Sequence, residues 1–139
     1  APITRTFESK KQKGAEVDLS SVFANSVKKA VRTVILDQKD HLEVIDRLET
    51  RDKEATVSWI MVTPAEAKIT GKNRIELTKD GQRMLLTADT GTEVEMKIWS
   101  NVPPHEYDFR NPGTIRVGFE TVIPANRASQ LKVRLIPLK

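Results

Sequence analysis

Alternation of apolar and polar residues over 55–86 restricts this stretch to β-structure more strongly than any other feature of the sequence. The residues predicted to share a buried face there are Val57, Trp59, Met61, Ile75, Leu77, Met84 and Leu86. Successive strand residues point to opposite faces, so the two-residue period predicts strands with one buried face. Asp80 and Gly81 interrupt the pattern with a residue pair typical of a tight hairpin turn. The centre of the chain is therefore predicted to be antiparallel sheet, with Trp59 in the core.

Similar runs recur along the rest of the chain between turn-forming residues. The segments predicted to be strands are 4–7, 27–37, 42–48, 55–61, 73–79, 82–87, 93–98, 114–122 and 130–136, with a brief element at 65–70. Within 93–98, Val94, Met96 and Ile98 are expected inward, which leaves Trp99 on the wet side or at a strand end.

Four other segments are predicted to lie outside the strands. Residues 10–14 read as an exposed connection, 49–54 as a charged loop and 88–91 as a turn. Residues 16–25 fit neither strand nor helix period, and are expected to be irregular with at most one helical turn.

About nine short strands and hardly a helix indicate an all-β fold. The predicted architecture is an antiparallel β-sandwich, with a closed barrel as the alternative, because each apolar sheet face needs a second layer to cover it. The 139 residues suffice for one core of ordinary size. We therefore expect a single domain over 1–139, with a possible weak seam near 62–66, where Pro64 interrupts the strand pattern.

Composition narrows the classes of function. The chain has no cysteine, which excludes disulfides and thiolate metal sites. A net charge of +4 is compatible with an anionic ligand, whereas an aromatic content of 5% and the lack of any recognisable motif argue against nucleic-acid binding. The sequence contains no run of about 18 apolar residues, so no membrane span is predicted. The first residues also lack the apolar region of an intact signal peptide.

The candidate site residues lie in the proline-rich segment 100–113. His105 and Tyr107 should project to one side of an extended chain. Together they could move a proton, as polysaccharide β-elimination requires, and Arg110 could neutralise a uronate carboxylate. A surface loop in which Tyr107 packs on a neighbouring proline is the alternative. We predict no catalytic residue and treat His105, Tyr107 and Arg110 as candidates for substrate contact.

His41 is the other residue with possible chemistry. Carboxylates flank it in the sequence at Asp37, Asp40 and Glu43. Neighbours on a turn and a strand point in different directions, so an exposed turn histidine is expected in place of a metal site.

Several runs resemble the C-terminal β-rich region of heparinase II/III-like polysaccharide lyases. They are VSWIMVTPAEAKITGKNRIELTKDGQRMLL, VPPHEYDFRNPGTIRVGFE and LKVRLIP, with VDLSSVFANSVKKAVRTVIL and LEVIDRLET upstream. The resemblance extends from about Val17 to the end of the chain. It implies a parent enzyme with an α/α toroid followed by stacked antiparallel β-sheets, of which this chain is the last β part.

The resemblance implies a periplasmic or secreted parent that cleaves uronate-containing, glycosaminoglycan-like polysaccharides by β-elimination. The family's catalytic Tyr and His, and zinc where it is bound, belong to positions upstream, so no catalytic residue, metal ligand or cofactor is assigned to this chain. Its expected role is a non-catalytic accessory sandwich. Its expected partners are the upstream toroid and β domain and an anionic polysaccharide. The alternative is a free-standing carbohydrate-binding or interaction module, for which Trp99 is the candidate platform.

Overall fold

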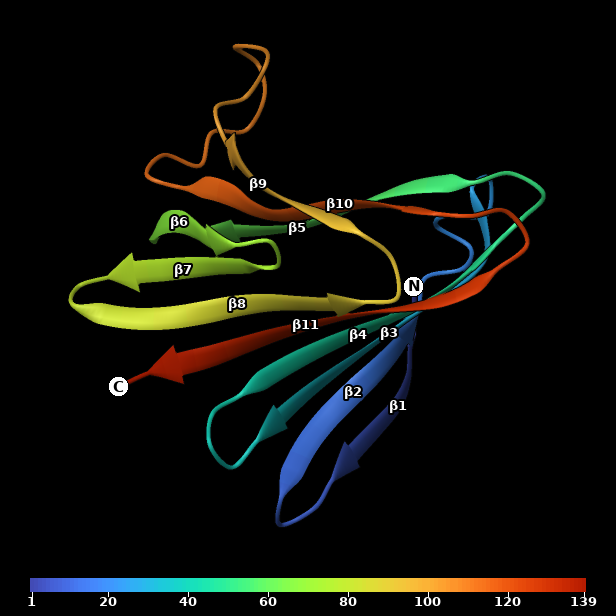
Figure 1. Cartoon of the computed structure of the whole chain (residues 1–139), viewed down its shortest axis with the longest axis horizontal. Coiled ribbons are helices and arrows are strands. Elements are labelled where there is room, and N and C mark those ends of the chain that lie inside the picture. Colours follow the sequence, from blue (N-terminus) through green and yellow to red (C-terminus); the bar gives the residue numbers. More distant parts are fainter.

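The computed structural model describes all residues, 1–139, and contains eleven strands and no helix (Figure 1). The strands are β1 (Ile3–Glu8), β2 (Gln12–Asp18), β3 (Val27–Asp37), β4 (Leu42–Thr50), β5 (Ala55–Thr63), β6 (Glu66–Gly71), β7 (Arg74–Lys79), β8 (Gln82–Thr90), β9 (Val94–Ser100), β10 (Ile115–Ile123) and β11 (Ala128–Leu138). This confirms the predicted all-β fold. The structure has no helix of the length and apolarity needed to cross a membrane.

The strands form two antiparallel sheets. The larger sheet has eight strands in the order β1-β2-β3-β4-β11-β8-β7-β6, and the smaller has three in the order β5-β10-β9. Hairpins build most of the large sheet, whereas β5, β9 and β10 leave it to form the second layer (Figure 1). The predicted sandwich is therefore confirmed. Its predicted seam near 62–66 falls where the chain passes from β5 in the small sheet to β6 in the large one.

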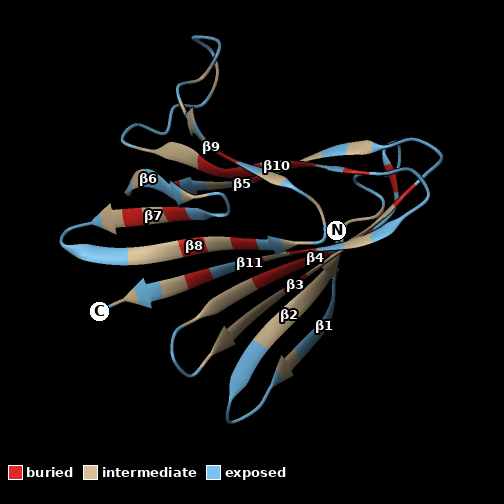
Figure 2. Cartoon of the chain, viewed as in Figure 1, coloured by how far each residue is buried: buried red, intermediate tan, exposed pale blue.

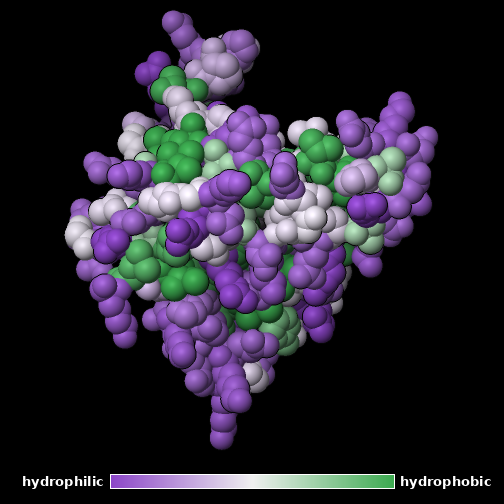
Figure 3. All heavy atoms as spheres, viewed as in Figure 1, coloured by the Kyte–Doolittle hydropathy of each residue, from purple (hydrophilic) through white to green (hydrophobic).

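The core lies between the small sheet and the middle of the large sheet. Its buried members are Val44, Trp59, Ile75, Leu77, Leu86, Ala88, Met96, Val117, Phe119, Leu131, Val133 and Leu135. Figure 2 shows this buried band on β7, β8, β10, β11 and β4, and no residue of β1 or β2 belongs to it. Hydrophilic side chains cover the end formed by β1 and β2 in Figure 3.

Trp59 is buried as the alternation predicts, with 6% of its surface exposed. Its indole stacks on the ring of Phe119, with ring centroids 6.1 Å apart and planes within 1° of parallel. Gly118, next to Phe119, has no room for a side chain, because a Cβ there would lie 1.7 Å from the carbonyl oxygen of Trp59. Close approach of β10 to β5 therefore depends on this glycine.

The hairpin between β7 and β8 also follows the prediction. Asp80 and Gly81 both have positive φ, at 51° and 76°. They form the two-residue connection between Lys79 and Gln82, the paired residues at the strand ends.

The structure has eleven strands where about nine were expected, because β2 was not predicted and the brief element at 65–70 is a full strand, β6. Three predicted boundaries are also wrong. Residues 12–18 form β2, although 10–14 was predicted to be a connection and 16–25 an irregular segment. Strand β4 continues to Thr50, into the predicted 49–54 loop, and β8 continues to Thr90, through most of the predicted 88–91 turn. In each case the ladder with a neighbouring strand extends over residues whose own sequence is polar or small. The expected helical turn is reduced to hydrogen-bonded turns between Leu19 and Phe23.

One side chain predicted to be buried is partly exposed. Ile98 was expected inward with Val94 and Met96, and it lies opposite the buried Val117 in the ladder, yet 40% of its surface is exposed. Strand β9 is the edge of the small sheet, so one flank of Ile98 has no neighbouring strand to cover it. Trp99 is half-buried within β9, which confirms the expectation of a partly exposed indole.

Candidate functional site

The loop 101–114, between β9 and β10, projects beyond both sheets and contains the three candidate contact residues (Figure 1). Hydrogen bonds close its base. The Asn101 Nδ2 donates to Thr114 Oγ1 over 2.7 Å, and the Arg116 guanidinium donates twice to the Ser100 carbonyl, over 3.1 and 2.9 Å. The loop is therefore anchored where it leaves the small sheet.

The far part of the loop is held by a local turn. The backbone N–H of His105 donates to the Asp108 carboxylate over 3.2 Å, and the N–H of Asp108 donates to the His105 carbonyl over 3.1 Å. Pro103, Pro104 and Pro112 have no N–H to donate to a ladder, which explains why the hairpin does not continue as paired strands.

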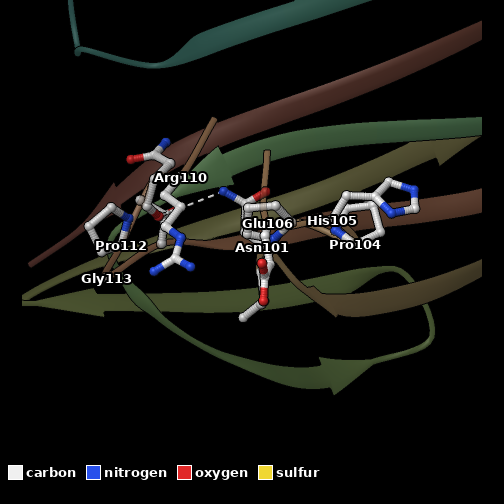
Figure 4. A pocket seen from close by; sticks show the side chains of 11 residues that line it. Asn101, Pro104, His105, Glu106, Arg110, Pro112 and Gly113 are labelled. Atoms are coloured by element: carbon white, nitrogen blue, oxygen red, sulfur yellow. Dashed lines mark hydrogen bonds between the residues drawn. The ribbon is translucent and has the colours of Figure 1, made fainter. Parts of the chain in front are cut away.

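A hollow of about 430 Å³ lies within this loop. His105 and Arg110 both line it and Tyr107 does not, and Figure 4 shows His105 and Arg110 towards opposite ends of it. Glu106 also lines the hollow, so its wall carries one formal positive and one formal negative charge. The hollow can therefore offer donors and an acceptor to a polar ligand.

The loop tip presents aromatic rings to solvent. The rings of His105 and Tyr107 stack with centroids 5.0 Å apart and planes within 4° of parallel, so both project to one side. They do so through the turn at 105–108 and not through the extended chain that the prediction assumed. Tyr107 is 83% exposed, which leaves little of its ring to pack on a neighbouring proline, the alternative considered above. Phe109 is 100% exposed. Contiguous exposed apolar surface can mark an interaction site.

Sequence reasoning missed Phe109. The only available signal was an aromatic residue in a proline-rich loop, and the same signal fits a ring folded back onto the domain. Its complete exposure depends on how far the loop extends from the small sheet, which alternation within strands does not specify.

The arrangement suits contact better than proton transfer. No hydrogen bond holds the imidazole of His105 or the hydroxyl of Tyr107, and both groups lie in open solvent surroundings. A general base needs a fixed position within hydrogen-bonding reach of the proton that it removes. The stacked rings, by contrast, provide a flat surface and two polar tips for a sugar.

His41 lies at the β3–β4 turn, as expected, but it is half-buried where an exposed histidine was predicted. Its Nδ1 is 3.5 Å from Asp37 Oδ2, and the Asp37 carboxylate accepts the backbone N–H groups of Lys39 and His41 over 2.7 and 3.1 Å. Partial burial raises the pKa of Asp37, but these N–H groups and the nearby cationic side chains outweigh it and hold the pKa below its ordinary value. Nowhere do three His, Cys, Asp or Glu side chains come together as metal ligands would.

No protein-family model matches the sequence, and no curated protein matches it either. Solved structures do match the fold. A heparinase III structure superposes with a TM-score of 0.72 and 12% identity, covering 99% of this chain and 21% of its own. A second heparinase III structure gives 0.68 and 14%, with 99% and 21% covered.

A third match is the heparan sulfate lyase HepC from Pedobacter heparinus, with a TM-score of 0.65, 16% identity, and 99% and 22% of the two chains covered. At such low identity the likeness establishes fold and not activity. This chain spans about a fifth of the length of the structures that it matches. Its two sheets therefore have the fold of a β-sandwich that heparinase III and heparan sulfate lyase structures contain as one part of a longer chain.

Proposed function

We propose that this chain is an accessory, non-catalytic, C-terminal β-sandwich of a polysaccharide lyase that cleaves uronate-containing, glycosaminoglycan-like polysaccharides by β-elimination. The observation that supports the proposal most strongly is the fold match over 99% of this chain to structures named as heparinase III. The sequence resemblance, stated above from separate runs of residues, points to the same enzymes. Such a parent acts in the periplasm or outside the cell, where its polymeric substrates occur.

The exposed position of the His105–Tyr107 pair supports the non-catalytic role. Beta-elimination needs a base that removes a proton next to the uronate carboxylate and a group that offsets that charge. His105 and Tyr107 are exposed at the tip of a loop, and no other segment buries a histidine. The reaction centre therefore belongs to the rest of the parent enzyme.

The loop 101–114 can still contact the polysaccharide at one wall of the cleft. Arg110 offers a planar guanidinium that pairs well with carboxylate or sulfate groups, and the aromatic rings offer a flat apolar surface. Glu106 and Asp108 in the same loop weaken its attraction for a polyanion. We therefore assign the loop a positioning role.

The test uses the intact lyase and heparan sulfate. The intact protein should release unsaturated uronate products that absorb in the ultraviolet. Combined substitution of His105→Ala, Tyr107→Phe and Arg110→Ala should raise KM about three- to tenfold with kcat nearly unchanged, because only ground-state contacts are removed. Absence of product from the intact protein overturns the lyase assignment. A fall in kcat of a hundredfold or more overturns the non-catalytic role.

The exposed rings also favour a second candidate, a carbohydrate-binding module that acts without an attached lyase. Phe109 and Tyr107 supply the open aromatic surface that such a module needs, and Trp99 is only half-buried. Retention on immobilised heparin that is lost with Tyr107→Ala and Phe109→Ala, combined with a gene that encodes no toroid, would select this alternative.

A further inference from the structure

The sandwich has four sheet edges, and three of them are protected against pairing with another strand. Strand β1 carries Arg5 and Glu8 and has a register shift between Ile3 and Arg5. Strand β6 carries Glu66 and Lys68 and also has a register shift. Strand β9 carries Glu95 and Lys97. Charges and bulges of this kind are the usual devices by which proteins keep edge strands from accepting a neighbour.

Strand β5, the fourth edge, has none of these devices. Its nine residues, ATVSWIMVT, include no charged residue and no proline. It pairs with β10 in unbroken register from Ala55 to Thr63. In the sheet order β5 has a neighbour on one side only, and no backbone hydrogen bond outside the ladders involves any of its residues. Every second N–H and C=O of β5 therefore lacks a partner within the chain.

A groove of about 270 Å³ runs beside this free edge. Residues 55–59 of β5 form one wall, and no residue of β10 contributes, so the groove lies on the unpaired side. The apolar residues of the other wall and floor are Leu19, Phe23, Val27, Ala30, Leu48 and Leu131. Half of the Phe23 surface is exposed. An added strand could therefore pair with β5 and place apolar side chains against β3 and β4.

The charged groups of the groove do not oppose such a strand. Arg32 Nε and Nη2 donate to the two carboxylate oxygens of Asp46 over 2.7 and 2.9 Å. This two-point pair satisfies both partners within the chain. The remaining lining is neutral, which favours an uncharged, β-branched or aliphatic strand.

We propose that the free edge of β5 accepts an additional β-strand, which is supplied by the part of the parent lyase that lies outside these residues. This occupant rests on the proposed function, since the matched heparinase structures contain about four-fifths of their length beyond the region that this chain covers. The sandwich is then joined to the enzyme by main-chain hydrogen bonds along β5. The added strand widens the three-stranded sheet, which then covers more of the eight-stranded sheet.

Hydrogen exchange of the intact protein and of the separately produced 139-residue chain tests the proposal. In the intact protein the β5 amides that face away from β10 should exchange at least about tenfold more slowly than in the separate chain. The β1 amides are the internal control, since that edge is protected by charge and should exchange alike in both samples. Ser58→Lys, which places a charge at the groove wall, should restore fast exchange at β5 in the intact protein. Thr70→Lys on the β6 edge is the matched control and should change nothing.

Equal exchange at β5 in both samples overturns the proposal, as does a gene that encodes no further residues. Concentration-dependent protection in the separate chain would also overturn it, because the occupant would then be a second copy. If Ser58→Lys does not fold in the intact protein, Phe23→Lys replaces it and should likewise restore fast exchange at β5. The comparison of wild-type intact protein with the separate chain then tests strand pairing without any variant. Lyase activity is measured on the same samples, so that protection without activity refutes the proposed function and leaves the strand pairing intact.

Discussion

At the scale of single residues, Trp59 is a buried core side chain whose polar atom has no partner. Its ring packs in the core against Phe119, while its Nε1 is buried with no hydrogen-bond partner. Burial of an unpaired donor costs about 1–3 kcal/mol, whereas burial of the ring stabilises the fold by more than that. The indole is therefore held in place by packing alone.

Trp59→Ala is expected to lower the free energy of unfolding by about 3–5 kcal/mol, because it leaves a cavity between the sheets. Trp59→Phe should cost no more than about half of this, since it keeps an aromatic ring and removes the unpaired donor. Urea denaturation of the two variants measures both values. A Trp59→Ala variant as stable as the wild type would place the indole outside the core.

Asp37 gives a prediction for pH. Its pKa is lowered in the folded state, so the folded chain binds fewer protons than the unfolded chain in the acid range. The stabilisation is present above the ordinary carboxyl pKa of about 3.9 and is lost as pH falls through the folded-state value. Asp37→Asn should therefore show a shallower loss of Tm below about pH 5 than the wild type. Asp52→Asn, at an exposed carboxylate without a hydrogen bond, should keep the wild-type slope.

At the scale of elements, alternation located the strands that pack in the core and failed where neighbours impose the structure. Strands β7 and β8 bury Ile75, Leu77 and Leu86 at the predicted positions, with Met84 half-buried, because burial on one face requires a two-residue period. Strand β2, with the sequence QKGAEVD, lacks such a period and exists because β1 and β3 pair with it on both sides. The strand propensity of single residues does not predict such a strand, because hydrogen bonding to the neighbouring strands determines its structure.

The candidate site was predictable in part for the same reason. His105 and Tyr107 do lie on one side of the chain, but a turn brings them there and not the extended chain that the spacing argument assumed. The structure brings His105 and Arg110, but not Tyr107, to the same hollow. The exposure of Phe109 and the free edge of β5 were beyond sequence reasoning, because both follow from which strands become neighbours in the folded chain.

Replacement of 102–113 by a four-residue Gly-Ser turn tests whether the loop serves the fold. No residue of 101–114 belongs to the core, and shorter loop closure offsets the lost local contacts, so the free energy of unfolding should change by about 1 kcal/mol or less. In the proposed parent lyase the same change should raise KM. A loss of several kcal/mol, measured by denaturant unfolding, would show that the loop is a structural element.

Hydrogen bonds of Thr50, the last residue of β4, link the large sheet to the connection between β10 and β11. The buried Thr50 hydroxyl can donate to the carbonyls of Pro124 and Arg127, over 2.7 and 3.2 Å, and accepts from the Arg127 N–H over 2.9 Å, which ties β4 to the β10–β11 connection. Thr50→Val keeps the shape and removes these hydroxyl bonds, and is expected to cost about 1–3 kcal/mol by thermal unfolding. Thr78→Val, where no hydrogen bond is present, should cost less than about 0.5 kcal/mol. Equal effects of the two substitutions would contradict the assigned role of Thr50.

At the scale of the whole molecule, the sandwich combines a self-contained core with two features that point outwards. The loop 101–114 presents aromatic rings at one end, and the β5 edge offers unpaired backbone beside an apolar groove. Neither contributes a fixed acid–base pair. Both fit the proposed role of a domain that positions and supports a reaction centre located elsewhere in a parent lyase.

The most direct test of this account is a lyase assay of the 139-residue chain beside the intact protein, at equal molar concentration on heparan sulfate. The account predicts ultraviolet-absorbing unsaturated uronate from the intact protein and none from the 139-residue chain. Product formation by the 139-residue chain alone would contradict it, because the reaction centre would then lie within these two sheets or their loops.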